Sequence, residues 1–247
     1  MQPAIAFREA SYRFDGRDVL RGLDLEVESG ETLVLLGRSG SGKTTALKLV
    51  NALLMPSGGE VLVEGTSTRS WDVIRLRRRI GYVIQESGLL PHLTVARNVG
   101  LVPELEGWPS ARIAARVDEL LDRVGLPPAE FRARFPRELS GGQRQRVGVA
   151  RALAANPPIL LFDEPFGALD PVSRLELQRQ LHALMKTLDK TCLFVTHDVR
   201  EALGLASRVA LLEDGRVSLV APPREFLHAE SAEARTFLAG LDWRLEP

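Results

Sequence analysis

A glycine-rich segment that ends in a lysine and threonines has the pattern of a phosphate-binding loop. Gly37-Arg38-Ser39-Gly40-Ser41-Gly42-Lys43-Thr44 matches G-x-x-x-x-G-K-[ST], lies between a strand-like run (32–36) and an apolar helical pattern, and is followed by Thr45. The glycines let backbone N–H groups surround phosphate oxygens, Lys43 neutralises the phosphates, and the Thr44 hydroxyl can ligate Mg²⁺. A glycine-rich turn that merely caps a helix would not require the full motif. We therefore predict that residues 37–45 bind the phosphates of ATP.

Two adjacent carboxylates end another apolar run. Ile159–Asp163 is expected to be a buried strand, with Asp163 at its carboxyl end and Glu164 directly after it. Ligands of a doubly wound sheet bind at the carboxyl ends of its strands, so Asp163 is placed to hold Mg²⁺ through water. Because neighbouring strand residues point to opposite faces, Glu164 is assigned the separate role of polarising the attacking water. An Asp-Glu pair alone would more often be a solvated strand end. Together with a P-loop in the same chain, the pair is better interpreted as catalytic.

A third segment predicts a second helix N-terminus that could bind an anion. Leu139-Ser140-Gly141-Gly142-Gln143 precedes a helical pattern from Arg144 to Ala155, with Ser140 at the N-cap. Alone, Ser-Gly-Gly would indicate no more than a capped helix. These five residues, the P-loop, the Asp163-Glu164 pair and His197 occur in an order that resembles the nucleotide-binding subunits of ABC transporters, and the resemblance covers the whole chain.

The resemblance implies a head-to-tail homodimer with ATP and Mg²⁺ as cofactors. In that family the Leu139–Gln143 segment of one subunit closes over the γ-phosphate held by the P-loop of the other. Ser140, Gly141, Gly142 and Gln143 are therefore expected to contact the partner's ATP. One chain offers two anion sites but one set of catalytic carboxylates, and two chains arranged head to tail would satisfy both.

Four more positions match the family one at a time. Phe14 lies where the family stacks an aromatic ring on adenine, with Tyr12 as the neighbouring candidate. Gln85 matches the glutamine that reaches Mg²⁺ and water and links the helical insertion to the site. Ala168-Leu169-Asp170 matches the segment at the dimer seam, although Asp170-Pro171 is also a good helix start. His197, after the strand-like run 192–196, matches the switch histidine that contacts the γ-phosphate.

The elements that must position these residues indicate an α/β fold. Strand-like runs alternate with amphipathic helical segments, the pattern of a largely parallel sheet. The resemblance implies a P-loop NTPase (RecA-like) core with an N-terminal antiparallel β subdomain and an inserted α-helical subdomain. We expect one domain over 1–247, comprising an antiparallel layer (1–30), the core (31–85 and 157–225), the helical subdomain (86–156) and a C-terminal tail (226–247). Ser110 is expected to cap a helix that Gly125 stops.

The composition limits the partners and the cellular location that we expect for the chain. Lys and Arg together number 32, as do Asp and Glu, so no basic surplus indicates a nucleic-acid partner. The apolar runs are far shorter than the roughly 18 residues that span a bilayer, and the start has no secretory leader pattern. A single Cys192 excludes an internal disulfide. We expect a cytoplasmic protein, and the resemblance implies a peripheral place on the cytoplasmic face of the membrane.

The residues after Gln85 narrow the resemblance. The stretch Gln85–Val95, then Asn98-Val99, Leu101-Val102-Pro103 and Gly107-Trp108, is similar to the ATPase subunits of glycine betaine, choline and related osmoprotectant importers. It lies where the family receives the coupling helix of the transmembrane permease, while a separate substrate-binding protein is expected to select the cargo. Several members continue into paired CBS domains, but this chain stops at Pro247, so ionic-strength sensing by such a tail is not expected.

Two other classes share part of the pattern. A soluble P-loop metabolic kinase would explain residues 37–44 but has no use for Leu139–Gln143 or His197. A non-transport ABC ATPase acting on ribosomes or DNA would share every motif, yet such proteins resemble tandem cassettes or cassettes split by long coiled coils. Another importer or an exporter remains an alternative, since the sequence fixes neither the substrate nor the direction of transport.

Overall fold

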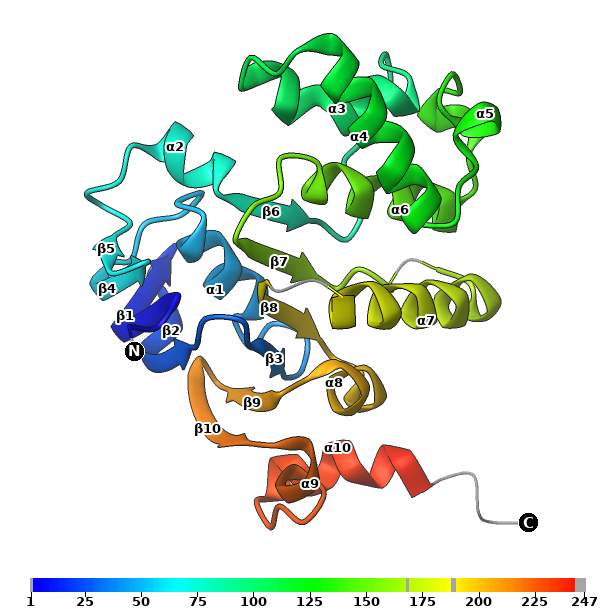
Figure 1. The fold of residues 1–247 in the computed structure, drawn as a ribbon. Coiled ribbons are helices and arrows are strands. Elements are labelled where there is room, and N and C mark those ends of the chain that lie inside the picture. The colour runs from blue at the N-terminus through cyan, green and yellow to red at the C-terminus, as the bar shows by residue number, and fades with distance from the viewer. Residues whose placement is uncertain (1, 168, 188–189, 243–247) are drawn as a thin grey trace. The chain divides into compact units, whose positions relative to one another are not determined.

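The computed structural model describes residues 2–167, 169–187 and 190–242 (Figure 1). The chain divides into two compact units. The P-loop unit consists of Met1–Arg77 and Lys190–Pro247, and the helical unit consists of Arg78–Asp189. Each unit has its own strands, and each carries part of the predicted site.

An antiparallel sheet forms one layer of the P-loop unit. Its strands, in the order β2-β1-β4-β5, are β1 (Ile5–Phe14), β2 (Arg17–Val27), β4 (Gly58–Val63) and β5 (Thr66–Ser67). The turn at Asp15-Gly16 joins β1 to β2, and both residues have the positive φ that a tight hairpin requires. The antiparallel layer expected within residues 1–30 extends further along the chain, because β4 pairs with β1 from Ile5↔Val63 to Ser11↔Gly58.

The second set of strands in the P-loop unit is built on the buried strands β3 (Thr32–Leu36) and β8 (Thr191–Thr196). Strand β3 lies parallel to both β8 and β9 (Arg208–Glu213), and β10 (Arg216–Ala221) runs antiparallel to β9. Near-continuous burial along β3 and β8 is typical of strands covered on both faces. A hairpin turn at Asp214-Gly215, both with positive φ, joins β9 to β10. The helices of this unit are α1 (Lys43–Val50), α2 (Val73–Arg78), α8 (Val199–Leu205), α9 (Pro223–Phe226) and α10 (Ala232–Asp242).

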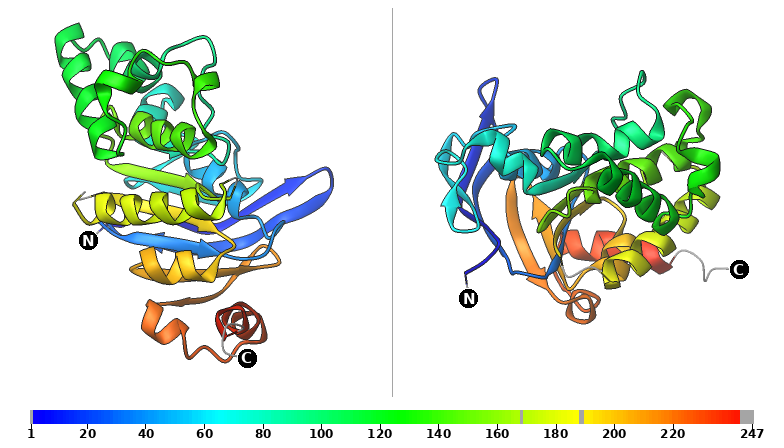
Figure 2. Two further views of the ribbon diagram at one scale, coloured as in Figure 1. Left: turned by 90° about the vertical axis from the view of Figure 1, so that its right-hand side faces the viewer. Right: turned by 45° about the horizontal axis from the view of Figure 1, so that its top comes forward.

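The helical unit contains a parallel pair of strands and a cluster of helices, which Figure 2 shows from two further sides. Strands β6 (Ile80–Val83) and β7 (Ile159–Asp163) pair from Ile80↔Ile159 to Val83↔Phe162. The helical elements are α3 (Val95–Leu105), α4 (Ser110–Arg123), α5 (Pro128–Phe131), a 3-10 turn (Pro136–Glu138), α6 (Gly141–Leu153) and α7 (Pro171–Thr187). Helix α6 packs against α3, α4 and β6, so it is the central element of the cluster.

One helix boundary differs from the prediction. Ser110 is the first residue of α4 and not its cap, because the N–H of Ile113 donates to the carbonyl of Pro109 at 3.0 Å and so places the cap one residue earlier. The buried residues Val117, Leu120 and Leu121 form the apolar face of this helix. Gly125, with φ of 70°, follows the end of α4 as expected.

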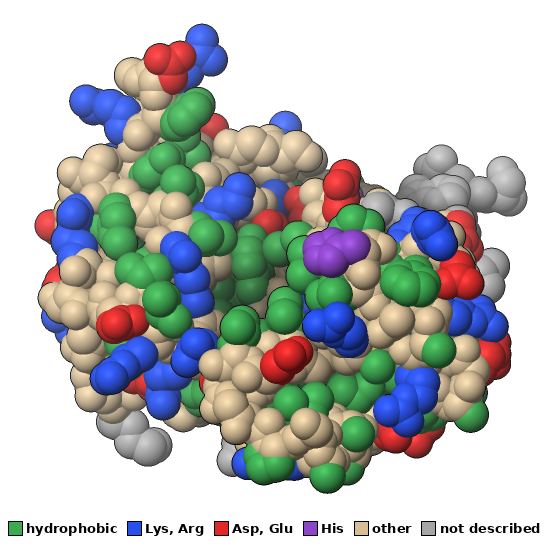
Figure 3. All heavy atoms as spheres, turned by 90° about the horizontal axis from the view of Figure 1, so that it is seen from above, with side chains coloured by type: hydrophobic (Ala, Val, Ile, Leu, Met, Phe, Trp, Pro, Cys, Tyr) green, Lys and Arg blue, Asp and Glu red, His purple; other side chains and the backbone are tan. Residues whose placement is uncertain are grey.

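The surface carries both signs of charge. Figure 3 shows basic and acidic side chains interspersed over one face, in keeping with a formal net charge of zero. Within the described ranges, no helix is both long enough and apolar enough to cross a membrane.

Candidate functional site

The P-loop forms where β3 ends and α1 begins. Gly42 caps α1 with φ of 105°, a conformation that strains any residue with a side chain, and a Cβ at this position would lie 2.7 Å from a methyl group of Leu20. Lys43 is 4% exposed, and its Nζ donates to the carbonyls of Gly37 and Arg38 at 2.9 Å each. These two bonds hold the ammonium group against the inside of the loop. The arrangement is a positively charged nest of the kind that binds phosphate.

His197 leaves the sheet at the same edge as the P-loop. In the parallel register, Leu36 of β3 pairs with Thr196 of β8, so Gly37 and His197 are the next residues of two adjacent strands. The turn that carries His197 is fixed by its neighbours. Thr196 Oγ1 accepts from the Asp198 N–H at 3.0 Å and donates to Glu201, and Asp198 caps α8. The His197 side chain is exposed, so it is accessible to a ligand.

The aromatic candidate lies in the hairpin that borders the start of α1. Tyr12 pairs with Leu20 across β1 and β2, and Leu20 is the side chain that meets Gly42. Phe14 is 66% exposed, whereas Tyr12 is half-buried. An exposed ring on this hairpin is free to stack on a base, so the geometry favours Phe14 over Tyr12.

Asp163, Glu164 and Gln85 lie together in the helical unit. Because Val83 pairs with Phe162, the residues that follow β6 and β7 leave at one edge. Asp163 is 7% exposed, and its Oδ2 accepts a hydrogen bond from Tyr82 Oη at 3.1 Å. Gln85 Nε2 and Glu164 Oε2 lie 3.3 and 3.6 Å from the position that a Cβ on Gly167 would occupy, so both border the same glycine.

Asp163 and Glu164 differ in backbone conformation. Asp163 is the last residue of β7, and Glu164 turns out of the strand with φ of 43°, a left-handed conformation that is uncommon outside glycine. Such local strain is found at active sites, where the surrounding structure holds a side chain in a required direction. The carbonyl of Glu164 accepts from the Gly167 N–H at 3.0 Å, which closes the turn.

Helix α6 begins as predicted at Ser140. The hydroxyl of Ser140 accepts from the Gln143 N–H at 3.2 Å, and the Gln143 side chain accepts from the Ser140 N–H at 2.9 Å. This reciprocal capping box occupies both polar side chains. An anion at this helix end would therefore be met by the N–H groups of Gly141 and Gly142 and by the positive end of the helix dipole.

The loop after Gln85 is held by α6 through residues that the sequence analysis missed. Arg151 donates to the carbonyls of Ser87 and Gly88 at 2.8 and 2.7 Å, and the buried Gln145 donates to the carbonyl of Ile84 at 3.1 Å. A Cβ on Gly148 would lie 3.4 Å from the Ser87 carbonyl oxygen, so the helix approaches the loop backbone closely. Polar residues on the buried side of a helical pattern are the signal that could have revealed these contacts.

Asn98 organises the next part of the same loop. Its side chain is fully buried, and its amide donates to the carbonyls of Leu90, Leu93 and Thr94 at 3.0 to 3.1 Å. Its Oδ1 accepts from the Leu90 N–H at 2.8 Å. The loop that carries the exposed His92 is therefore tied at four points to one side chain.

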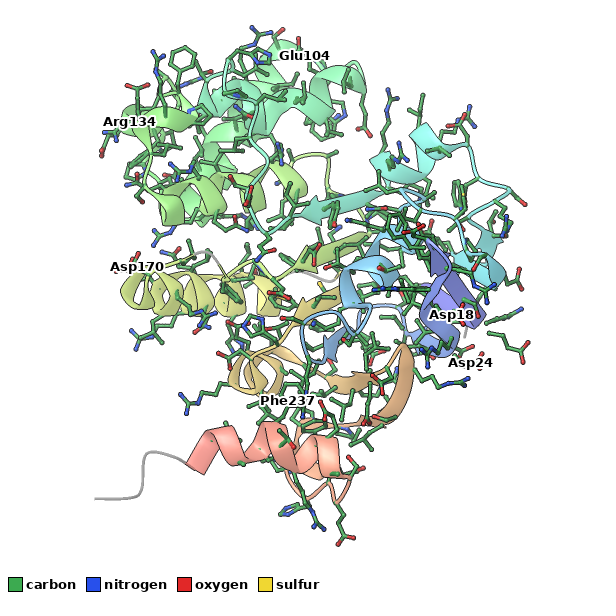
Figure 4. All side chains as sticks on the ribbon, turned by 180° about the vertical axis from the view of Figure 1, so that it is seen from behind. Asp18, Asp24, Glu104, Arg134, Asp170 and Phe237 are labelled. Atoms are coloured by element: carbon green, nitrogen blue, oxygen red, sulfur yellow. The ribbon has the colours of Figure 1, made fainter. Side chains whose placement is uncertain are left out.

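Asp170 lies at the start of α7, and Figure 4 shows it at that end of the helix. Its carbonyl accepts from the Arg174 N–H at 2.9 Å, as the predicted helix start requires. Ala168, the first residue of the segment assigned to the dimer seam, is outside the described residues.

The predicted site residues divide between the two units. Phe14, residues 37–45 and His197 belong to the P-loop unit, and Gln85, residues 140–143, Asp163, Glu164 and Asp170 belong to the helical unit. In the parts of the chain that the structure describes, no three His, Cys, Asp or Glu side chains form a metal-binding group. Cys192 is a buried core residue, and its burial raises the pKa of the thiol to about 12.

Comparisons with known proteins agree on one family. The family model described as ABC transporter matches residues 20–167. The chain is 47% identical over 218 residues to the glycine betaine/carnitine/choline transport ATP-binding protein OpuCA of Bacillus subtilis, covering 88% of this chain and 57% of that protein. It is 48% identical over 213 residues to the glycine betaine uptake system ATP-binding protein YehX of Escherichia coli, covering 86% of this chain and 69% of that protein.

A solved structure matches most of the chain. The dimeric post-hydrolysis state of an ATP-binding cassette bound to ADP and Pi superposes with a TM-score of 0.80 at 33% identity. The match covers 89% of this chain and 99% of that one, so the predicted P-loop fold is confirmed.

Proposed function

Because the chain belongs to the ABC transporter family, we propose that it binds and hydrolyses ATP as the motor subunit of a membrane transporter. The observation that carries this proposal is the P-loop, in which a buried ammonium group is held against the carbonyls of Gly37 and Arg38 beside the start of α1. A positively charged nest of this kind favours a polyphosphate. The chain spans 57% of the length of OpuCA, so the full activity of that relative is carried over only as a proposal.

The side chains present fit a hard divalent cation. Asp163 offers a carboxylate, Thr44 a hydroxyl and Gln85 an amide oxygen, which are the ligand types that Mg²⁺ takes alongside phosphates and water. Mg²⁺ would neutralise charge on the phosphates when bound. Glu164 polarises the attacking water from the turn, with φ of 43°, that follows Asp163. His197 contacts the γ-phosphate from the strand end next to the P-loop.

The proposed working form is a head-to-tail homodimer. The capping box leaves the backbone N–H groups of Gly141 and Gly142 to meet the γ-phosphate on the partner, with Ser140 and Gln143 fixing their direction. Phe14 stacks on the adenine, and Asp170 lies at the seam between subunits. The solved cassette named above is described as dimeric, which supports this arrangement.

The proposed transport partner is a permease that docks on the loop from Gln85 to Val95, at the cytoplasmic face of the membrane. The loop begins beside Glu164 and Gly167 and continues to the exposed His92. Relatives named for glycine betaine, carnitine and choline transport support a quaternary amine as cargo, which a separate substrate-binding protein would select. No role in nucleic-acid binding is proposed.

Two measurements test this function. Lys43→Ala should weaken ATP binding by about a hundredfold or more in a calorimetric titration, because charge-assisted bonds to the phosphates are lost. Lys48→Ala, on the same helix, is the matched control and should bind as the wild type does. If the reconstituted complex accumulates no quaternary amine while its binding protein holds another solute, the cargo assignment falls and the ATPase assignment stands.

A further inference from the structure

The second residue of the P-loop is tied to the C-terminal helix α10. Arg38 Nε and Nη2 donate to the two carboxylate oxygens of Glu233 at 2.6 and 2.9 Å, although the residues are 195 positions apart. The Glu233 side chain is 13% exposed and that of Arg38 63% exposed. Paired, nearly parallel bonds of this kind fix direction as well as distance. A hollow of about 400 Å³ is bordered by this pair, by Ser39 and Gly40, and by the β9–β10 turn.

Contacts on several sides hold helix α10 in place and therefore fix the position of the Glu233 carboxylate. Ser231 caps the helix by accepting from the Ala234 N–H at 3.2 Å, and Ala234 is fully buried. Arg200 of α8 donates to the Gly240 carbonyl at 3.3 Å, and α10 packs against α8. Figure 4 shows Phe237 on the side of α10 that faces α8. Glu233 lies in the first turn of α10, where the helix dipole stabilises a negative charge.

The same P-loop residue is bonded through its main chain to the phosphate-binding lysine. The carbonyl of Arg38 accepts from Lys43 Nζ, so Arg38 is fixed at its side chain by Glu233 and at its backbone by Lys43. We propose that Glu233 is a positioning residue for nucleotide binding, which acts through Arg38 to hold the P-loop in the shape that receives phosphate. A loop that is already ordered loses less conformational entropy when the ligand binds.

The inference rests on nucleotide binding at the P-loop, and its test is a double-mutant cycle read as the Kd for ADP, which is not consumed. Glu233→Gln should raise the Kd about threefold, the size of a well-formed but partly exposed ion pair. In an Arg38→Gln background, the same Glu233→Gln change should have no further effect. Glu230→Gln, an exposed carboxylate near the start of α10, is the matched control and should leave the Kd unchanged.

A merely structural clamp would behave differently. It would lower the thermal midpoint in Glu233→Gln without changing the Kd, and that result would overturn the proposal. An equal loss of affinity in the Arg38→Gln background would also overturn it, because Glu233 would then act by another route. Tighter binding in Glu233→Gln would overturn it too, because the pair would then hold the loop away from the shape that receives phosphate. The ratio of mutant to wild-type Kd should approach one as salt is raised, since the pair is partly solvated. A wild-type protein that bound no ADP would refute nucleotide binding itself.

Discussion

Replacing Arg151 with Met should loosen the loop after Gln85 without unfolding the protein. The substitution keeps much of the side-chain bulk but removes both hydrogen bonds to the Ser87 and Gly88 carbonyls. Gly88 is exposed, so water can replace the bond to its carbonyl, whereas Ser87 is 6% exposed and its carbonyl loses its charged partner. A hydrogen bond to a charged group contributes about 1.5–3 kcal/mol. We therefore expect a loss of about 2 kcal/mol, which corresponds to roughly thirtyfold more frequent opening.

Native-state hydrogen exchange measures this opening directly. The Ser87 N–H donates to the Ile84 carbonyl at 3.2 Å, so its protection reports whether the turn is closed. A peptide covering residues 84–90 should exchange roughly thirtyfold faster in Arg151→Met, while peptides from β3 should be unchanged. Arg123→Met is the control, because Arg123 forms only a half-exposed ion pair with Glu119 on α4 and should cost less than about 0.5 kcal/mol.

The reasoning would be refuted if exchange in residues 84–90 stayed at the wild-type rate in a folded Arg151→Met protein. That result would mean that Gln145 and the close contact at Gly148 hold the loop without the guanidinium. Faster exchange throughout the helical unit would instead show that Arg151 stabilises the whole unit and has no special relation to the loop.

Three further predictions concern turnover, assembly and coupling. Glu164→Gln should bind ATP but release phosphate at least about 10²-fold more slowly, because an amide cannot accept a proton; near-normal release would exclude Glu164 as the catalytic carboxylate. The same variant should elute as a dimer in size exclusion with ATP and not with ADP, and adding Ser140→Arg should restore the monomer; a stable dimer without nucleotide would contradict the γ-phosphate switch. Substitution of Leu89 or His92 should leave the basal ATPase rate of the isolated subunit unchanged but weaken co-purification with the permease, and a loss of basal rate would argue against a docking role.

Local signals in the sequence were enough to predict the motif-bearing elements. The P-loop, the strand that ends at Asp163 and the helix start at Ser140 each combine a run of apolar residues with a distinctive end, and the structure has each element where it was expected. These signals depend only on periodicity and on neighbouring residues. The roles assigned to the residues within them remain predictions, which the experiments above address.

The contacts that could not be predicted join residues far apart in the chain. The pairing of β4 with β1 and the bidentate bond between Arg38 and Glu233 leave no periodic pattern, because each depends on how the folded elements meet. Arg151 likewise has the local appearance of an ordinary helical arginine. Arg151 can donate to the Ser87 carbonyl only because α6 lies close to the loop. The missing side chain of Gly148 leaves room for this close approach.

Helix α6 joins the parts of the helical unit that the proposed mechanism requires to move together. Its first turn, capped by Ser140, presents N–H groups for the partner's phosphate, and its later residues Gln145 and Arg151 hold the loop that starts at Gln85. A 13-residue helix transmits displacement of one end to the other, because stretching it would break its internal hydrogen bonds. If phosphate binding displaces the Ser140 end, the loop must move with the helix or lose the bonds from Arg151. Because breaking the hydrogen bonds from Arg151 to the loop costs free energy, movement of the loop with the helix is the favoured outcome. The exchange experiment measures that free energy.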